Sequence, residues 1–223
     1  MIRFRNAGKA FRSRRNKREL VWPLRHFTAT IVQGESTAIL SPNDSDKTTL
    51  IDLVAGTETL TEGEIVRTGH ISWPASFRGM INPRMTARQN LRFLTDAYGH
   101  DFGAAYEFVH DFTELGRQMD QIVRQCTNEQ RHRLAIAMLL AMNFEFILVD
   151  ETFEAGDMNF RRKVTQFIDD NQDRITFFMA TNNARLAERY CQRAGILVDG
   201  TVTFFDTMTE AVAEFRRYRK EDF

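Results

Sequence analysis

The sequence has only two cysteines, Cys126 and Cys191, which are too few for the disulfide framework of a small secreted protein. No apolar run approaches the roughly 18 residues needed to cross a bilayer. The first residues, MIRFRNAGKAF, lack the continuous apolar stretch of a signal peptide. Lys and Arg balance Asp and Glu, 30 against 30, so net charge gives no reason to expect nucleic acid or an acidic membrane as a partner. We therefore expect a cytoplasmic globular protein.

Short apolar segments alternate with amphipathic segments along most of the chain. Near-continuous apolar runs are typical of strands that are buried on both faces, as in parallel sheets covered by helices. Asp199-Gly200 suits a two-residue hairpin turn. No linker separates two independent domains, so we predict one α/β domain over residues 1–223. The pattern predicts strands at 36–40, 144–150 and 174–180 and a hairpin at 195–206. It predicts a largely helical region at 84–124, helices at 129–143, 183–193 and 209–219, and a further helix whose first residues are 48–55.

A basic run, RSRRNKREL, occupies residues 12–20. Charge runs usually form solvated surface, which here predicts a loop between two strands. Nucleic-acid binding is the alternative, but aromatic side chains are not interleaved with these charges. We expect no nucleic-acid partner.

The segment AILSPNDSDKTTLIDLVAG, residues 38–56, has the order of a phosphate-binding loop, with an apolar strand before the loop and an amphipathic helix after it. The P-loop pattern G-x-x-x-x-G-K-[ST] falls on SPNDSDKT. Lys47 would reach the β and γ phosphates, and Thr48 would offer its hydroxyl to Mg²⁺. A chance Lys-Thr pair at a helix start is the alternative for this segment taken alone. The candidate nucleotide-binding residues here are Ser41, Asn43, Asp44, Ser45, Asp46, Lys47, Thr48 and Thr49.

The glycines of the P-loop pattern are absent from this segment. Ser41 and Asp46 replace the first and last glycine, and Asp44 stands where many P-loops have another. Loss of the left-handed backbone freedom of glycine predicts a cost of about 1–2 kcal/mol. The second predicted cost is charge, because like charges about 4 Å apart repel by about 1 kcal/mol in water and about 4 at an effective dielectric constant of about 20.

Three other segments resemble ABC transporter ATPases. FEFILVDETFEAGDMNFRRK, residues 144–163, resembles their Walker B segment and D-loop, and CTNEQRHRLAIAM, residues 126–138, occupies the place of their signature motif. Residues 195–215 are similar to the end of the same domain. The closest resemblance is to the ATPase subunits of capsule polysaccharide exporters of Gram-negative bacteria, which share SWP, RxRLA and GDxxFRRK stretches, here at 72–74, 131–135 and 156–163. The resemblance covers nearly the whole chain.

The resemblance implies the ABC ATPase fold, which has a P-loop NTPase-type parallel sheet flanked by helices, an antiparallel β region near the N-terminus and a helical subdomain, here at about 84–140. It also implies a dimer, homomeric or heteromeric, that binds ATP and Mg²⁺. The dimer would dock on transmembrane permease subunits at the cytoplasmic face of the inner membrane and power polysaccharide export. Each nucleotide would lie between the P-loop of one chain and the signature of the other.

Carried over by position, the resemblance assigns roles to single residues. Phe11 would stack on adenine. Asp150 would hold Mg²⁺ together with Thr48, and Glu151 would polarise the attacking water as general base. Asp157 falls on the D-loop aspartate, which communicates across the dimer. The alternative for the Asp150-Glu151 pair is an acidic surface pair at the end of a strand.

The signature, Q-loop and switch positions depart from the family. The usual L-S-G-G-Q is CTNEQ, so Thr127 keeps a hydroxyl while Asn128 and Glu129 replace glycines, and Glu129 adds a charge that would repel phosphate. The Q-loop glutamine aligns with Asn82. The switch histidine aligns with Asn182, which can hydrogen-bond a phosphate but carries no positive charge. The last signature residue, the glutamine, is retained as Gln130.

Two functions follow from this mixture of kept and altered motifs. One is a working ATPase subunit of an exporter, as the full-length resemblance and Lys47, Thr48, Asp150 and Glu151 imply. The other is a non-catalytic ABC-fold subunit that dimerises or docks on a transporter with little or no turnover, as the altered P-loop and signature favour. The two cysteines are expected to be small buried side chains, because no metal-ligand spacing surrounds them.

Overall fold

The computed structural model describes residues 1–13, 16, 18–75, 80–151 and 156–221, with side chains up to residue 218. The chain forms two compact units. The first, called the sheet unit, comprises Met1–Pro74, Glu145–Thr152 and Asp173–Phe223. The second, called the helical unit, comprises Ala75–Phe144 and Phe153–Gln172. Among the described residues, no helix is both long enough and apolar enough to cross a membrane.

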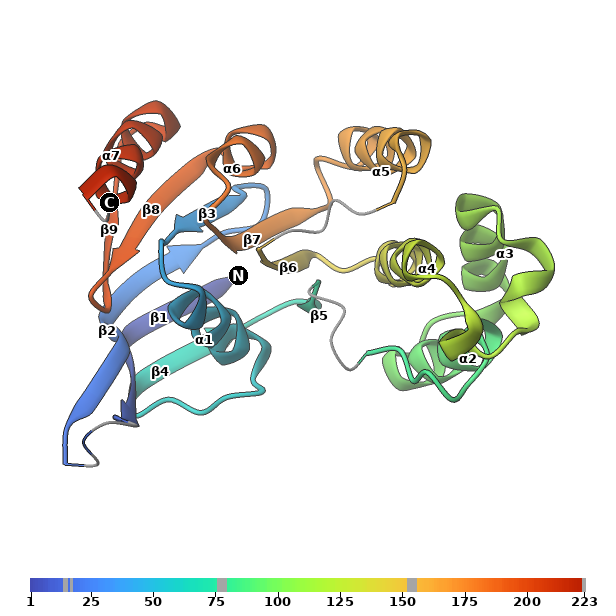
Figure 1. The fold of residues 1–223 in the computed structure, drawn as a ribbon, viewed down its shortest axis with the longest axis horizontal. Helices are drawn as coiled ribbons and strands as arrows, with labels where there is room; N and C mark the ends of the chain where they lie inside the picture. The colour runs from blue at the N-terminus through green and yellow to red at the C-terminus, as the bar shows by residue number, and fades with distance from the viewer. Residues whose placement is uncertain (14–15, 17, 76–79, 152–155, 222–223) are drawn as a thin grey trace. The chain divides into compact units, whose positions relative to one another are not determined.

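A six-stranded sheet forms the centre of the sheet unit (Figure 1). All neighbouring strands are parallel except the last pair, which is the predicted hairpin. Every residue of β3 and β7 is buried, which explains why both strands are continuous apolar or small-residue runs. The strands predicted at 36–40, 144–150 and 174–180 are confirmed. In sheet order they are β5 (Ile71–Pro74), β6 (Phe146–Asp150), β7 (Thr176–Thr181), β3 (Thr37–Leu40), β8 (Arg193–Val198) and β9 (Thr201–Phe204).

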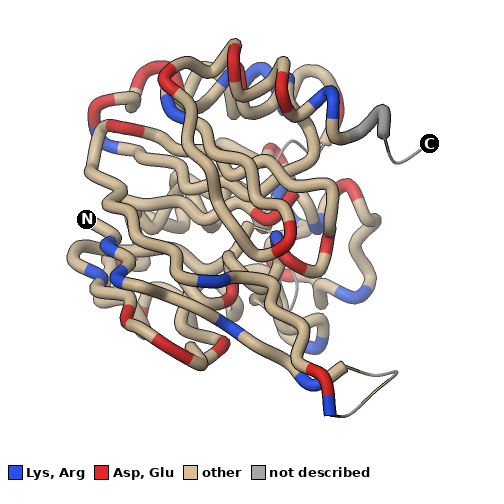
Figure 2. The backbone as a smooth tube through the Cα atoms, turned by 90° about the vertical axis from the view of Figure 1, so that its left-hand side faces the viewer, with Lys and Arg blue, Asp and Glu red and all other residues tan. Residues whose placement is uncertain are grey.

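A second, antiparallel sheet near the N-terminus has the order β2 (Leu20–Ile31), β1 (Ile2–Arg12) and β4 (Glu62–Arg67). Arg12 pairs with Leu20, so the basic run connects two strands, as predicted. Residues 14, 15 and 17 of that run lie outside the described residues. In Figure 2 basic and acidic residues are interspersed along the tube, in keeping with their equal numbers.

Among its described residues, the sheet unit also contains three helices. α1 (Asp44–Ala55) lies on one side of the six-stranded sheet, and α6 (Ala184–Tyr190) and α7 (Met208–Glu221) lie on the other (Figure 1). The core includes the rings of Phe4 in β1 and Phe178 in β7, whose centroids are 5.9 Å apart. This contact packs the two sheets against each other.

The helical unit contains α2 (Ala87–Tyr98), α3 (Phe102–Thr113), α4 (Asn128–Ala141) and α5 (Met158–Asp170), with short 3₁₀ turns at Gly116–Asp120 and Val123–Gln125. Capping boxes start α2 and α4. Phe108 and Phe112 of α3 contact Phe167 of α5 at ring-centroid distances of 5.4 and 5.9 Å. The helical character predicted for 84–124 and 129–143 is confirmed.

The β8–β9 turn consists of Asp199 and Gly200, both with left-handed backbone, at φ 50° and 77°. The carbonyl oxygen of Gly200 accepts a hydrogen bond from the Arg25 N–H of β2 at 2.7 Å. A Cβ at Gly200 would overlap the backbone carbonyl oxygen of Trp22. Only glycine therefore fits this contact between the turn and β2.

We predict that Gly200→Ala lowers the free energy of unfolding by two additive causes. The left-handed backbone costs about 1–2 kcal/mol for alanine, and moving the β2 backbone costs about 1–3 kcal/mol more. Gly56→Ala is the matched control, because Gly56 has φ 79° but a Cβ added there would meet no atom of another part of the chain within 4 Å. Chemical denaturation of both variants measures the difference. Equal losses would show that the turn does not pack tightly on β2.

Candidate functional site

The start of α1 lies directly after β3. The Asn43 side chain caps the helix by accepting a hydrogen bond from the Ser45 N–H at 3.0 Å. The Lys47 N–H donates to the Asn43 carbonyl oxygen at 3.3 Å, which is the first hydrogen bond of the helix. The helix therefore begins at Asp44, and the predicted start at Thr48 is wrong. An amide cap and acidic residues in the first turn both favour a helix start, which explains the earlier boundary.

None of the residues that replace the P-loop glycines has a positive φ. Asp44 and Asp46 have helical backbone within α1. Ser41 is buried, donates its N–H to the Thr181 carbonyl oxygen at 3.2 Å and accepts from the Asn43 N–H through its hydroxyl at 3.3 Å. The predicted backbone strain therefore does not arise in this structure, because the segment adopts a helical turn.

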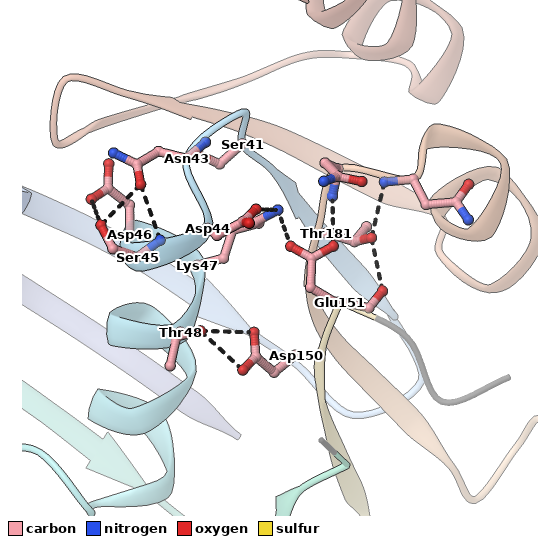
Figure 3. Close-up of polar contacts among 12 residues, drawn as sticks. Ser41, Asn43, Asp44, Ser45, Asp46, Lys47, Thr48, Asp150, Glu151 and Thr181 are labelled. Carbon is pink, nitrogen blue, oxygen red and sulfur yellow. Dashed lines mark hydrogen bonds and ion pairs between the residues drawn. The ribbon is translucent and has the colours of Figure 1, made fainter. Parts of the chain in front are cut away.

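Lys47 is a fully buried cation. Its Nζ lies 3.0 Å from Asp44 Oδ1 and also forms an ion pair with Glu151 Oε1 (Figure 3). Within the described part of the chain, neither Nζ nor Glu151 Oε1 makes a hydrogen bond of regular geometry, so the contacts between them are chiefly electrostatic. A buried ammonium without counter-charges would be strongly unfavourable. Asp44 and Glu151 supply those counter-charges, and we call this group the Lys47 clasp.

Glu151 is held at the end of β6 by its backbone. Its N–H donates to the Ala180 carbonyl oxygen and its own carbonyl oxygen accepts from Thr181 Oγ1, both at 2.9 Å. Its φ is 70°, a conformation that non-glycine residues rarely adopt and that is often found at functional sites. The second carboxylate oxygen, Oε2, accepts from the Asn182 N–H at 3.5 Å. The carboxylate is thus aimed at the α1 start from a fixed backbone.

Thr48 and Asp150 bring two oxygen donors together beside the clasp. Thr48 Oγ1 donates to Asp150 Oδ2 at 3.0 Å, with Oδ1 at 3.3 Å (Figure 3). Thr48 comes from the first turns of α1 and Asp150 from the carboxyl end of β6. A hydroxyl and a carboxylate are hard oxygen ligands of the kind Mg²⁺ prefers. The pair therefore fits a magnesium ion.

Two other predicted loop residues serve the helix itself. Thr49 Oγ1 donates to the Ser45 carbonyl oxygen at 2.7 Å, so this hydroxyl is engaged within α1. Asp46 is only 8% exposed and accepts from Ser45 Oγ at 3.3 Å. Burial raises the pKa of the Asp46 carboxyl above its ordinary value, and the Asp199 carboxylate raises it further. Asp46 therefore differs from Asp44 in its environment, because the Asp44 side chain is mostly exposed to solvent.

The remaining predicted residues lie elsewhere in the two units. Phe11 is on β1, partly exposed, with Lys9 Nζ 4.8 Å from its ring centroid. In the helical unit, the backbone N–H of Asn82 donates to Asn90 Oδ1 and the Asn82 side chain accepts from the Arg84 N–H. The residues predicted to form the signature and the D-loop lie at helix starts. Thr127 and Gln130 form the capping box of α4, Asn128 and Glu129 are its first two residues, and Asp157 caps α5.

Sequence reasoning missed two residues at these positions. Thr181 donates to the Glu151 carbonyl oxygen and accepts from the Asn183 N–H at 3.0 Å. A hydroxyl at the end of a buried strand was the available signal. Arg133 contacts both Glu129 and Asp157. The i,i+4 spacing from Glu129 was the signal for that ion pair. Both cysteines are buried, as predicted, and burial raises the pKa of Cys191 to about 12.

Known proteins resemble this chain over most of its length. Residues 24–154 match the model of the ABC transporter family. The capsule polysaccharide export ATP-binding protein CtrD of Neisseria meningitidis serogroup B is 31% identical over 211 residues, which are 95% of this chain and 96% of CtrD. The ATP-binding protein BexA of Haemophilus influenzae is 29% identical over 220 residues, which are 99% of this chain and 100% of BexA. A dimeric ATP-binding cassette solved with ADP and phosphate has a similar fold, with a TM-score of 0.76, 23% identity, and 93% of this chain and 99% of that chain covered.

The buried Asp46 predicts a pH-dependent stability. Because its folded-state pKa is raised, the ionised carboxylate destabilises the folded chain above that pKa, and the penalty disappears as the pH falls below the ordinary value of 3.8. Asp46→Asn is therefore expected to be more stable than the parent at about pH 7, with a gain that shrinks toward about pH 4. Thermal unfolding across this range is the measurement, and Asp96→Asn, at an exposed position, is the control. A variant less stable than the parent at every pH would contradict this account of Asp46.

The geometry of the site and the comparisons with known proteins both support the resemblance seen in the sequence motifs. A helix that starts after β3 places Lys47 and Thr48 beside Asp150 and Glu151 at the carboxyl end of β6. The resemblance seen in the motifs is confirmed, and so is the predicted α/β fold. This chain belongs to the ABC transporter family.

Proposed function

We propose that the chain is the ATP-binding subunit of an ABC transporter that exports a capsular polysaccharide across the inner membrane. The observation that carries this proposal is the full-length similarity to CtrD and BexA. The name of CtrD refers to capsule polysaccharide export, and the aligned region covers nearly all of both proteins. Length and sequence therefore support the same specialised branch of the family.

Mg·ATP would bind at the start of α1. Thr48 and Asp150 would hold the magnesium ion, because their oxygens already lie within 3.0 Å of each other. Magnesium would neutralise part of the phosphate charge. Lys47 would pair with the β and γ phosphates, since a buried ammonium needs an anionic partner in every state of the site.

Binding at this site requires the Lys47 clasp to open. The Asp44 carboxylate is the more readily released partner, because its side chain is 83% exposed and regains hydration when it turns outward. Phosphate oxygens would then replace the carboxylate oxygens around Nζ. Asp44 would thus compete with phosphate for the Lys47 ammonium and would move away from it when phosphate binds.

Glu151 would be the general base. Once phosphate pairs with Lys47, the Glu151 carboxylate is free to accept a proton from the attacking water. Its tethered backbone keeps the carboxylate at the end of β6 during this exchange. Asn182, whose N–H already faces Glu151 Oε2, would hydrogen-bond the terminal phosphate through its side chain.

Assembly would complete the site. We propose a single nucleotide-binding domain over residues 1–223, with a helical subdomain at about 84–140. Two such domains would dimerise on permease subunits at the cytoplasmic face of the membrane. Phe11 would stack on adenine, and Asn82 would couple the site to the permease. Each P-loop segment, residues 41–49, would face the signature residues of the second chain, which are Thr127, Asn128, Glu129 and Gln130, with Asp157 communicating between the sites.

A non-catalytic subunit is the second candidate. The observation that favours it is the Lys47 clasp. In the clasp two carboxylates pair with the Lys47 ammonium, which would otherwise be available to bind phosphate. In that case the chain would dimerise or dock on a transporter without turnover. The two candidates differ in what Glu151 does after ATP binds.

We predict that Glu151→Gln lowers the rate of ATP hydrolysis by about 100-fold or more, as expected for the loss of a general base. The affinity for Mg·ATP is expected to be retained or strengthened. Binding is retained because glutamine removes a carboxylate from Lys47 without removing any phosphate contact. Phosphate release and nucleotide affinity are measured on the purified chain. Glu145→Gln, at the residue directly before β6, is the control for loss of a carboxylate at the opposite end of the same strand.

The export function is tested in an encapsulated bacterium that lacks its own capsule-export ATP-binding protein. The parent chain, expressed with its permease, is expected to restore surface polysaccharide, and Glu151→Gln is expected not to. Equal restoration by both would favour the non-catalytic subunit. Hydrolysis in vitro without restoration would contradict the proposed substrate class.

A further inference from the structure

Arg133 of α4 joins the starts of two helices in the helical unit. Its Nη2 lies 2.6 Å from Glu129 Oε1 and 2.6 Å from Asp157 Oδ2. Glu129 is in the first turn of α4, and Asp157 caps α5. One guanidinium therefore neutralises the acid that replaces a signature glycine and ties it to the D-loop aspartate.

Both carboxylates are fixed by more than this ion pair. Asp157 Oδ1 accepts from the Phe160 N–H at 2.8 Å, and this bond together with Arg133 lowers the pKa of the Asp157 carboxyl. Glu129 precedes Arg133 by four residues, the favourable order for a helical ion pair. Its place in the first turn also suits the positive end of the helix. The two carboxylates thus point at one cation.

Arg133 itself has little freedom to leave. Its side chain is 19% exposed, and its Cζ lies 5.5 Å from the ring centroid of Phe160. Its Nε is buried without a hydrogen-bond partner among the described residues. A largely buried guanidinium depends on the two carboxylates for much of its charge compensation. By contrast, the guanidinium of Arg131, two residues earlier, donates to the neutral side chain of Asn128 in its own helix turn.

The same compensation occurs at the start of α1. In both helices an amide or hydroxyl side chain caps the first turn, an acid follows within two residues, and a base three or four residues later pairs with that acid. In α1 the pair is Asp44 with Lys47, and in α4 it is Glu129 with Arg133. Each of these two acids, which replace motif glycines, therefore has its own intrahelical counter-charge.

We propose that Arg133 is a positioning residue that cancels the charge of Glu129 and fixes the start of α4 to the start of α5, so that the altered signature can approach the phosphates of a second copy. The inference rests on the proposed function, because it takes residues 127–130 to face the nucleotide of the partner copy. Without Arg133, the Glu129 carboxylate would face that nucleotide uncompensated and would repel it. Arg133 acts through Glu129 and Asp157 and touches no reacting atom.

The test measures ATP-dependent association of the full chain in the Glu151→Gln background, by sedimentation at increasing Mg·ATP. Arg133→Gln is expected to raise the ATP concentration for half-association about ten-fold, as loss of a close charge partner does at interfaces. Adding Glu129→Gln is expected to restore it to within about two-fold, because no uncompensated carboxylate remains. Arg131→Gln is the matched control and is expected to leave association unchanged. Thermal unfolding confirms that each variant is folded, and Arg133→Lys, which keeps the charge, is expected to rescue part of the loss.

The outcomes separate this inference from the proposed function. An Arg133→Gln deficit that is equally large with Glu129→Gln present would overturn the charge-cancelling role. If the parent chain does not associate with ATP, the proposed dimer site fails instead. A double-mutant cycle of Arg133→Gln and Asp157→Asn on unfolding, without nucleotide, then still decides the positioning role: coupling between the two positions supports it, and additive effects contradict it.

Discussion

A buried ammonium group without counter-charge is strongly unfavourable in a protein core. The Lys47 side chain is fully buried and therefore needs counter-charges. Its Nζ is reached by Asp44 from its own helix and by Glu151 from the end of β6. The ion pair with Glu151 links the start of α1 to the carboxyl end of β6. It also brings Thr48, the next residue, to Asp150, the residue before Glu151. The lysine, the magnesium ligands and the general base of the proposed mechanism therefore meet where the start of α1 faces the end of β6.

The altered motifs take a different meaning once their contacts are known. From the sequence, Asp44, Asp46 and Glu129 were three charges that would repel a triphosphate. In the structure Asp44 pairs with Lys47, Glu129 pairs with Arg133, and Asp46 is buried with a raised pKa. Asp44 and Glu129 each have a counter-charge, whereas Asp46 accepts a hydrogen bond from Ser45 but forms no ion pair among the described residues. None of the residues that replace the P-loop glycines has a positive φ. A chain can thus keep the family fold and the chemical residues of the site while losing the glycines.

The sequence predicted the elements whose signal is local. Buried strands such as β6 and β7 are continuous apolar runs, and the Asp199-Gly200 turn has the residues that a tight hairpin needs. The resemblance to ABC transporter ATPases implied that Thr48 and Asp150 share a magnesium site, and the structure brings their oxygens together. The start of α1 and the partners of Asp44 and Glu129 were not predicted. These depend on which long side chains are brought together by packing and capping, and spacing along the chain leaves several such pairings open.

The most direct test of the central claim is the affinity of the purified chain for Mg·ATP by titration calorimetry, measured for the parent, Lys47→Ala and Asp44→Asn. The account predicts that the parent binds, that Lys47→Ala does not, and that Asp44→Asn binds more tightly than the parent because a competitor for the ammonium has been removed. Absence of binding by the parent at millimolar nucleotide, or equal affinity of the parent and Lys47→Ala, would contradict the claim that the Lys47 ammonium exchanges its carboxylate partners for phosphate.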